Sequence, residues 1–196
     1  MSAEHEYEEV TDDVVRLRVA FVNLYFVGAR RTGGAAADAT PWALVDAALA
    51  MGTARILEVA AERFTPAARP AAIVLTHGHF DHVGALEALL AFWDVPVYAH
   101  PLELPFLTGK ADYPPPDPTV GGGAIARLSP LFPRSGPRLE ESRVRPLPAD
   151  GSVPGMPGWR WLHTPGHAPG HVSLFRASDR TLIAGDAVTK IGRAHV

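Results

Sequence analysis

The chain has 196 residues, of which 47% are hydrophobic and 20% charged, a composition that suits one globular domain with a substantial core. Its formal net charge of −3 supplies no basic surface that could hold nucleic acid, so we expect no nucleic-acid partner. Because the chain has no cysteine, disulfides and thiolate metal sites are excluded, and a metal would have to be held by imidazole and carboxylate groups.

The first ten residues, MSAEHEYEEV, are acidic and polar. They have neither the basic start nor the apolar run of a secretory signal, so we expect a cytoplasmic protein. We expect residues 1–13 to form an acidic tail ahead of the folded domain. The longest apolar run, residues 83–93, contains Glu87 and is too short to cross a bilayer, so we expect no membrane partner either.

Short apolar runs alternate with helical patterns along the first hundred residues. Residues 14–27 are rich in β-branched and aromatic side chains and predict two strands with a turn near residues 20–23. Further strands are expected at residues 42–46, 71–76 and 95–99, and helices at residues 47–64 and 83–93. This alternation is typical of a layered α/β fold, in which sites lie at the ends of strands.

Prolines and glycines interrupt the stretch from residue 101 to residue 157. They exclude regular sheet there, and we predict a long ordered loop with a short helix near residues 124–131, a kind of loop that often carries function. A surface insertion without a role is the alternative interpretation. Three more strands are expected at residues 159–163, 171–176 and 181–184.

Three histidines and one aspartate fall within six positions, directly after a predicted buried strand: His77, His79, Asp81 and His82. In an extended segment, side chains two residues apart point to the same side, so His77 and His79 can bind one ion. Asp81 and His82 lie where the chain turns into a helix and can serve a second ion. The helix start would favour an ionised Asp81. Solvated loop histidines are the alternative, but so dense a cluster of ligand types favours a metal centre.

The segment from Thr76 to Gly84, THGHFDHVG, resembles the H-x-H-x-D-H signature of the metallo-β-lactamase superfamily. Three other stretches are similar to further motifs of that family in the expected order: LVD at residues 44–46, HTPGH at 163–167 and IAGD at 183–186. The resemblance implies an α/β fold, the αββα sandwich of that family, over residues 14–190.

The same resemblance implies a centre of two divalent metal ions, for which zinc is the best match, although iron and manganese accept the same ligand types. It assigns the first metal to His77, His79 and His167, the second metal to Asp81 and His82, and the bridge between both metals to Asp186.

Three further residues near these motifs are expected to support the ligands. Asp46 would orient a ligand imidazole, because a metal-bound histidine usually donates its other N–H to a carboxylate or carbonyl. A strand-end aspartate with a purely structural role is the alternative. His163 and His171 flank His167 and are expected either to support it or to pack beside it.

The chain ends ten residues after Asp186. The resemblance implies a further strand, a helix and a final histidine for the second metal, so we expect the last strand and helix of the sandwich to be missing. Residues 191–196, IGRAHV, look like the in-frame translation of a common sequencing adapter, and we expect them to be a non-native tail. His195 follows Asp186 too closely to be the missing ligand.

The expected activity is metal-dependent hydrolysis. Two divalent ions would lower the pKa of a shared water, and the resulting metal-bound hydroxide would cleave an ester-type bond, a thioester or lactone, in a small-molecule substrate. Asp81 would orient this hydroxide and carry a proton to the leaving group. Two alternatives stay open: an oxidoreductase of the same fold that resembles persulfide dioxygenases and uses one iron, and a weakly active metal-binding fragment.

Overall fold

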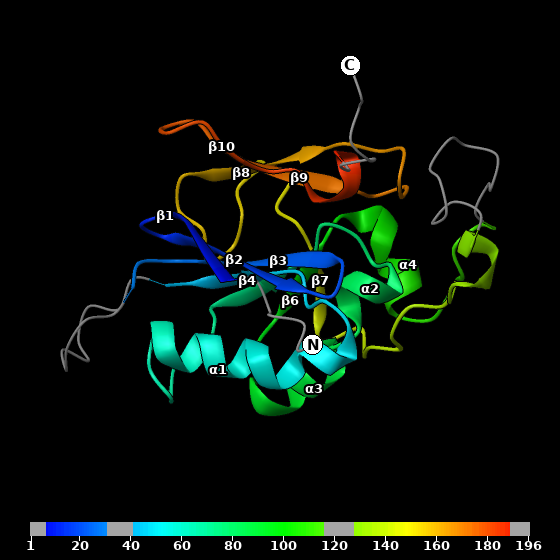
Figure 1. The fold of residues 1–196 in the computed structure, drawn as a ribbon. Helices are drawn as coiled ribbons and strands as arrows, with labels where there is room; N and C mark the ends of the chain where they lie inside the picture. The colour runs from blue at the N-terminus through cyan, green and yellow to red at the C-terminus, as the bar shows by residue number, and fades with distance from the viewer. Residues whose placement is uncertain (1–6, 31–40, 116–127, 189–196) are drawn as a thin grey trace, which may run out of the picture.

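The computed structural model describes residues 7–30, 41–115 and 128–188. In this part of the chain two sheets lie face to face, one in the order β1-β2-β3-β4-β5-β6-β7 and one in the order β10-β9-β8 (Figure 1). The strands are β1 (Tyr7–Thr11), β2 (Val14–Val19), β3 (Val22–Val27), β4 (Ala43–Val45), β5 (Ala72–Val74), β6 (Val97–Ala99), β7 (Val144–Pro146), β8 (Trp159–His163), β9 (Val172–Arg176) and β10 (Thr181–Ile183).

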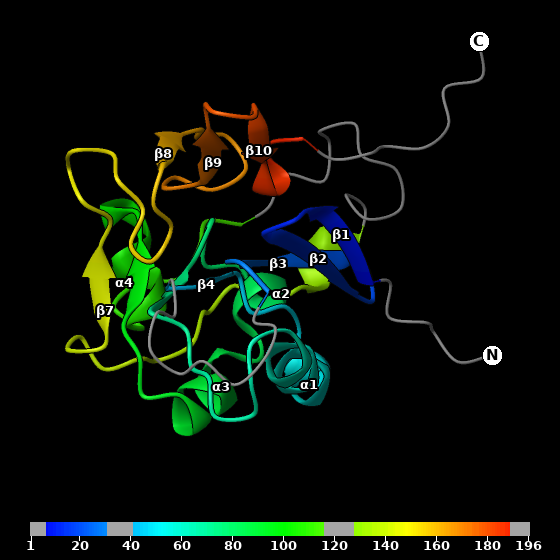
Figure 2. The same ribbon diagram turned by 90° about the vertical axis from the view of Figure 1, so that its left-hand side faces the viewer.

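Helices cover the face of the larger sheet that points away from the smaller one. The α-helices are α1 (Thr53–Arg63), α2 (Phe80–Val83), α3 (Leu86–Phe92) and α4 (Leu104–Leu107). Figures 1 and 2 show α1 and α3 on the opposite side of the larger sheet from β8, β9 and β10. The expected α/β sandwich is therefore confirmed, with three of its four layers, helices, sheet and sheet, in the described residues. None of these helices is long and apolar enough to cross a membrane.

The pairing of the strands brings two chain segments to one edge of the larger sheet. Strands β1 to β4 pair antiparallel, whereas β4 pairs parallel with β5, and β5 with β6. Parallel neighbours need a crossover, here through α1 and then through α2 and α3. Because neighbouring parallel strands have their carboxyl ends on the same side of the sheet, Asp46, which follows β4, lies beside the segment that follows β5.

Two apolar cores hold these layers together. The central strands β4 and β5 are buried along their whole length, as expected for parallel strands covered on both faces. Between the larger sheet and its helices, Trp42 stacks on Phe64 with ring centroids 4.2 Å apart. Between the two sheets, Met156 and Trp159 pack with the buried side chains of β9.

The strands predicted before residue 100 and after residue 158 are confirmed, with ends that differ by at most two residues. The single helix predicted over residues 83–93 is instead α2 followed by α3, and α2 begins at Phe80. Of the helix expected near residues 124–131, residues 128–131 are described, where Leu128 is helical and Ser129–Leu131 form a 3-10 turn.

Two expectations were wrong. The supposed acidic tail, residues 1–13, includes strand β1, which pairs antiparallel with β2 and whose acidic side chains face solvent. Glu8 forms an ion pair with Arg16 at 2.7 Å. The acidic side chains therefore lie on an edge strand, where charged residues are common. The stretch 101–157 was expected to contain no sheet, yet it contains β7, which pairs parallel with β6. Pro146 is compatible with this strand because β7 is at the sheet edge.

The first core yields a test of the packing. Leu44→Ala should lower the free energy of unfolding by about 2–5 kcal/mol, because Leu44 is fully buried in β4 and its truncation leaves a cavity. Leu182→Ala is the matched control, since Leu182 is 52% exposed, and it should change stability by about 0.5 kcal/mol or less. Urea denaturation measures both. Equal effects of the two substitutions would contradict the assignment of the core.

Candidate metal centre

Both sheets contribute to the candidate metal centre. His77 and His79 lie in the loop after β5, and Asp81 and His82 lie on α2, which follows that loop. From the smaller sheet, His167 lies in the connection between β8 and β9. Asp186 lies in the 3-10 turn after β10. The six residues that the resemblance assigned to the metals are thus carried by segments that follow strands of the two opposite sheets.

Three imidazoles converge on one point. The Nε2 atom of His167 lies 2.9 Å from Nδ1 of His79 and 3.2 Å from Nε2 of His77. The three residues form a group whose ligand atoms all lie within 4.8 Å of one another. This is the donor set that the resemblance implies for the first metal, and three nitrogens at such spacing can surround a single cation.

A second group of ligand atoms adjoins the first. It consists of His77, His82 and Asp186. The Asp186 carboxylate faces both groups, because Oδ1 lies 3.4 Å from Nε2 of His82 and Oδ2 lies 3.4 Å from Nε2 of His167. Asp81 lies at the margin of this second group, with Oδ2 3.9 Å from Nε2 of His82. His77 belongs to both groups, a position that the sequence did not indicate.

Asp46 supports two of these imidazoles on their Nδ1 side, directly for His82 and through Thr76 for His77. Its Oδ2 lies 2.9 Å from Nδ1 of His82 and also accepts a hydrogen bond from Oγ1 of Thr76 at 2.8 Å, while Oδ1 accepts from the Thr76 N–H at 2.8 Å. The Thr76 hydroxyl in turn lies 3.1 Å from Nδ1 of His77. One buried carboxylate therefore orients His82 directly and His77 through Thr76, and leaves both Nε2 atoms free to face the centre.

The three-imidazole group has the protonation state that a metal needs. Burial, reinforced by the neighbouring imidazoles, lowers the pKa of His77 well below its ordinary value and that of His79 to about 3. Burial also lowers the pKa of His167. These rings are therefore neutral at pH 7, the state in which an imidazole nitrogen can bind a cation. Such a donor set fits a divalent cation of the zinc or iron type.

The second group is charged differently. Burial works against a charge on His82, but Asp46 and Asp186 outweigh it and raise the pKa of His82 to about 10. Burial likewise opposes ionisation of Asp186, yet His82 and His167 hold the pKa of this carboxyl below its usual value. Burial raises the pKa of Asp81 above its usual value and outweighs the contributions that would favour its ionised form. Binding of a cation by His82 would release a proton from this ring.

The two histidines that flank His167 have different surroundings. His171 is fully buried, its Nε2 accepts a hydrogen bond from the Asp186 N–H at 3.0 Å, and its ring centroid lies 5.2 Å from that of His77. His163 is exposed, stacks on His100 with ring centroids 4.3 Å apart, and has its Nε2 2.9 Å from the carbonyl oxygen of Pro169. His171 thus supports Asp186, whereas His163 packs beside the turn.

Three residues that the sequence analysis did not single out contact the candidate ligands or the loop that carries them. Thr76 links Asp46 to His77 as described above. Glu103 accepts a hydrogen bond from the N–H of Gly78, the residue between the first two histidines. Tyr113 lies against His79, with ring centroids 4.4 Å apart. Only Thr76 adjoins the signature, so it alone could have been inferred from the sequence.

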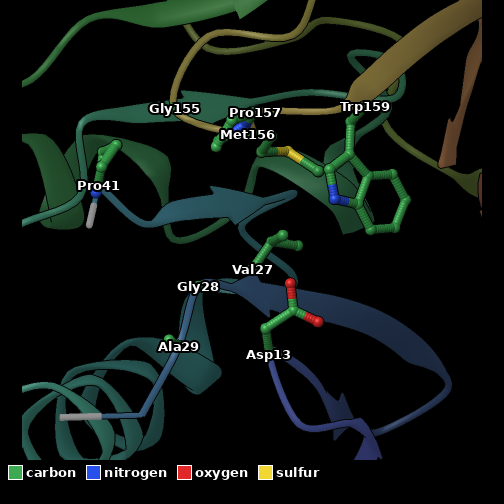
Figure 3. A pocket seen from close by; sticks show the side chains of 9 residues that line it. All are labelled: Asp13, Val27, Gly28, Ala29, Pro41, Gly155, Met156, Pro157 and Trp159. Carbon is green, nitrogen blue, oxygen red and sulfur yellow. The ribbon is translucent and has the colours of Figure 1, made fainter. Parts of the chain in front are cut away.

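A small cavity elsewhere in the molecule does not belong to this centre. It is lined by Asp13, Met156 and Trp159 among other residues and has a volume of about 100 Å³ (Figure 3). None of its lining residues is one of the expected ligands. Because ligand pockets usually enclose about 300 Å³ or more, this cavity is not a candidate substrate site.

Two facing sheets with a histidine and aspartate centre at their strand ends define a class of metal-dependent α/β sandwich proteins. Residues 18–196 match the model of the family described as the Metallo-beta-lactamase superfamily, and the chain belongs to this family. The match includes residues 191–196, which lie outside the described residues, as do residues 189 and 190. That residues 191–196 are non-native and that a last strand and helix are missing stay predictions.

Several relatives resemble the chain over most of its length. It is 45% identical over 183 residues to "Probable metallo-hydrolase YflN" of Bacillus subtilis, covering 93% of this chain and 67% of the relative. "Probable metallo-hydrolase YybB" of the same organism is 33% identical, and the chain spans 55% of its length. Among solved structures, TTHA1623 in a di-iron-bound form is 30% identical with a TM-score of 0.58, covering 93% of this chain and 77% of that one.

The Asp46 network yields a test of the centre. Asp46→Asn should lower metal affinity about 10- to 100-fold, because an amide presents an N–H₂ group where two carboxylate oxygens now serve Thr76 and His82. Competition with a chromophoric chelator measures the change. Asp150→Asn is the control, since Asp150 is exposed and its carboxylate accepts hydrogen bonds from Ser152 in its own turn, away from the centre. Wild-type affinity in Asp46→Asn would show that the network does not support the ligands.

Proposed function

We propose that this protein is a metal-dependent hydrolase that cleaves an ester-type bond, a thioester or lactone, in a small-molecule substrate. The position of Asp186 carries the proposal. Its two carboxylate oxygens lie at equal distances from His82 and His167, so one side chain faces two adjacent groups of ligand atoms. Two cations held side by side by imidazoles and a shared carboxylate are a recurrent arrangement in metal-dependent hydrolases.

The two groups, together with Asp81, which the resemblance adds at the margin of the second group, indicate the residues that would hold the two cations. His77, His79 and His167 would hold one cation, and His82, Asp81 and Asp186 the other, with Asp186 shared between them. When bound, such cations lower the pKa of water toward neutrality and polarise a carbonyl oxygen. Zinc and iron both accept these ligands, and the related TTHA1623 has been solved in a di-iron-bound form.

Asp81 would transfer the proton in this reaction, first as a general base and then as a general acid. Its side chain is 17% exposed, so it is partly shielded from water but still reachable from the open side of the centre. Burial raises its pKa toward the range in which a carboxyl group can both accept and return a proton. Asp81 would therefore take a proton from the attacking water on a carboxylate oxygen and deliver it to the departing alkoxide or thiolate.

The surroundings of the centre favour a small organic substrate. The side chains of His167 and Asp186 are 37% and 33% exposed, so the centre is open to solvent on the side formed by the smaller sheet. Phe80, which adjoins Asp81 in α2, packs on Phe132 with ring centroids 5.5 Å apart. These two rings provide apolar surface beside the centre, and the net charge of −3 disfavours nucleic acid as a substrate.

A panel of substrates tests this proposal. The zinc- and iron-loaded proteins are offered acyl-thioesters, acyl-homoserine and simple lactones, a β-lactam and a phosphodiester, and metal content is measured in parallel. We expect turnover of a thioester or lactone to exceed that of the other classes. Oxygen consumption with a thiol persulfide and one bound iron, without hydrolysis, would instead support the dioxygenase alternative.

One substitution separates the role of Asp81 from that of the ligands. Asp81→Asn should reduce kcat about 10²- to 10⁴-fold, because an amide cannot accept the proton, while the protein keeps the cation of the three-imidazole group. Steady-state kinetics and metal analysis measure the two effects. Asp94→Asn is the control, since Asp94 is exposed and pairs with Arg143 away from the centre. Undiminished turnover by Asp81→Asn would refute the proposed proton transfer.

A further inference from the structure

Glu103 is a buried acid for which the proposed reaction has no use. It ends the 3-10 turn Pro101–Glu103, directly after β6, and its exposed fraction is 0%. A carboxyl group at such a position needs hydrogen-bonding partners that replace the water it has lost. Its partners therefore indicate why the protein keeps it there.

The partners of Glu103 are the backbones of the two loops that carry the three converging imidazoles. Oε2 accepts a hydrogen bond from the N–H of Gly78 at 2.9 Å, and Gly78 lies between His77 and His79. Oε1 accepts from the N–H of Gly170 at 2.6 Å, three residues after His167. The first loop belongs to the larger sheet and the second to the smaller one, so this single side chain connects the two layers.

Tyr113 completes the connection. Its hydroxyl donates a hydrogen bond to Oε2 of Glu103 and accepts one from the N–H of Gly78 at 3.0 Å. Its ring stacks on Phe106, with centroids 4.0 Å apart, and lies against the ring of His79. Glu103 and Tyr113 thus hold the backbone of the first loop and one face of its second histidine.

Both loops approach this pair more closely than a side chain would permit. A Cβ atom added to Gly78 would lie 2.7 Å from the hydroxyl oxygen of Tyr113, and one added to Gly170 would lie 2.8 Å from Cγ of Glu103. Glycine is therefore required at both positions for the backbone N–H groups to reach the carboxylate. The close approach shows that both loops are fitted to this side chain.

We propose that Glu103 is a positioning residue that sets the spacing between the loop of His77 and His79 and the loop of His167, and so brings their nitrogens together on one cation. The inference rests on the metal centre of the proposed function. His167 is attached to the smaller sheet, and its Nε2 lies within 3.2 Å of nitrogens from the larger sheet. A connection between the layers fixes that spacing, and Glu103 contacts both loops within a few residues of the ligands, in addition to the backbone hydrogen bond from Val172 N–H to the Thr76 carbonyl oxygen.

The isosteric substitution Glu103→Gln tests this role. A carboxylate accepts at both oxygens, whereas an amide offers one oxygen and one N–H₂ group, so one of the two loops would face a donor instead of an acceptor. We expect zinc affinity at the three-imidazole group to fall about 10-fold or more and the visible absorption spectrum of the cobalt-substituted protein to change. Both are measured well below the melting temperature, with zinc or cobalt as the only added ligand.

Two further variants make the test independent of a general loss of stability. Gly170→Ala keeps every hydrogen-bonding group but forces Glu103 and the loop apart, and it should weaken zinc binding and alter the cobalt spectrum in the same way. Asp13→Asn is the matched control, because it removes a carboxylate that pairs with Arg176 on β9 and contacts no ligand loop. It should lower the melting temperature and leave zinc affinity and the cobalt spectrum unchanged.

The outcomes separate this inference from the proposed function. If the wild-type protein binds no metal, both fail. If it binds zinc and Glu103→Gln binds it equally tightly with the wild-type cobalt spectrum, the positioning role is wrong and the proposed function stands. Should Glu103→Gln not fold, Gly170→Ala decides by the same criterion: unchanged affinity and spectrum overturn the role, and a loss of affinity with a changed spectrum supports it.

Discussion

The metal centre depends on keeping imidazoles from two different sheets in fixed orientations. On the larger sheet, the carboxylate of Asp46 orients His82 directly and His77 through Thr76. Asp46 has a φ of 62°, a backbone conformation that costs a non-glycine residue about 1–3 kcal/mol. Its contacts with Thr76 and His82 are buried and involve a carboxylate, and such hydrogen bonds contribute about 1.5–3 kcal/mol each. The strained backbone is therefore offset by the network that it makes possible.

The smaller sheet contributes the remaining ligands, and these too must be kept in fixed orientations. His171 holds the backbone of Asp186, and Glu103 holds the loop that carries His167 against the loop of His77. The side chains of His167 and Asp186 are about one third exposed, so these supporting contacts, and not burial of the two ligands themselves, keep them in place. The centre thus has a rigid inner side, built on strand ends, and an open outer side where a substrate can approach.

The parts of the fold and of the metal centre that could be predicted from the sequence are those whose interacting residues lie close together along the chain. The cluster from His77 to His82 is local, so its spacing alone indicated a metal centre, and the resemblance extended it to His167 and Asp186. Glu103 could not be found in that way, because it bonds to residues 25 and 67 positions away. His163 and His171 both lie four positions from His167, and only the structure shows that one is buried against the centre and the other exposed. Strands β1 and β7 were missed because an edge strand tolerates the charges and the proline that argue against sheet.

The central claim is that two adjacent cation positions share Asp186. X-ray diffraction from crystals of the zinc-loaded protein, collected on both sides of the zinc absorption edge, tests it most directly, because anomalous scattering locates the metal independently of any assumed ligands. The account predicts two peaks, one contacting His77, His79 and His167 and one contacting His82 and Asp186. A single peak away from Asp186, or no zinc bound by these histidines, would contradict it.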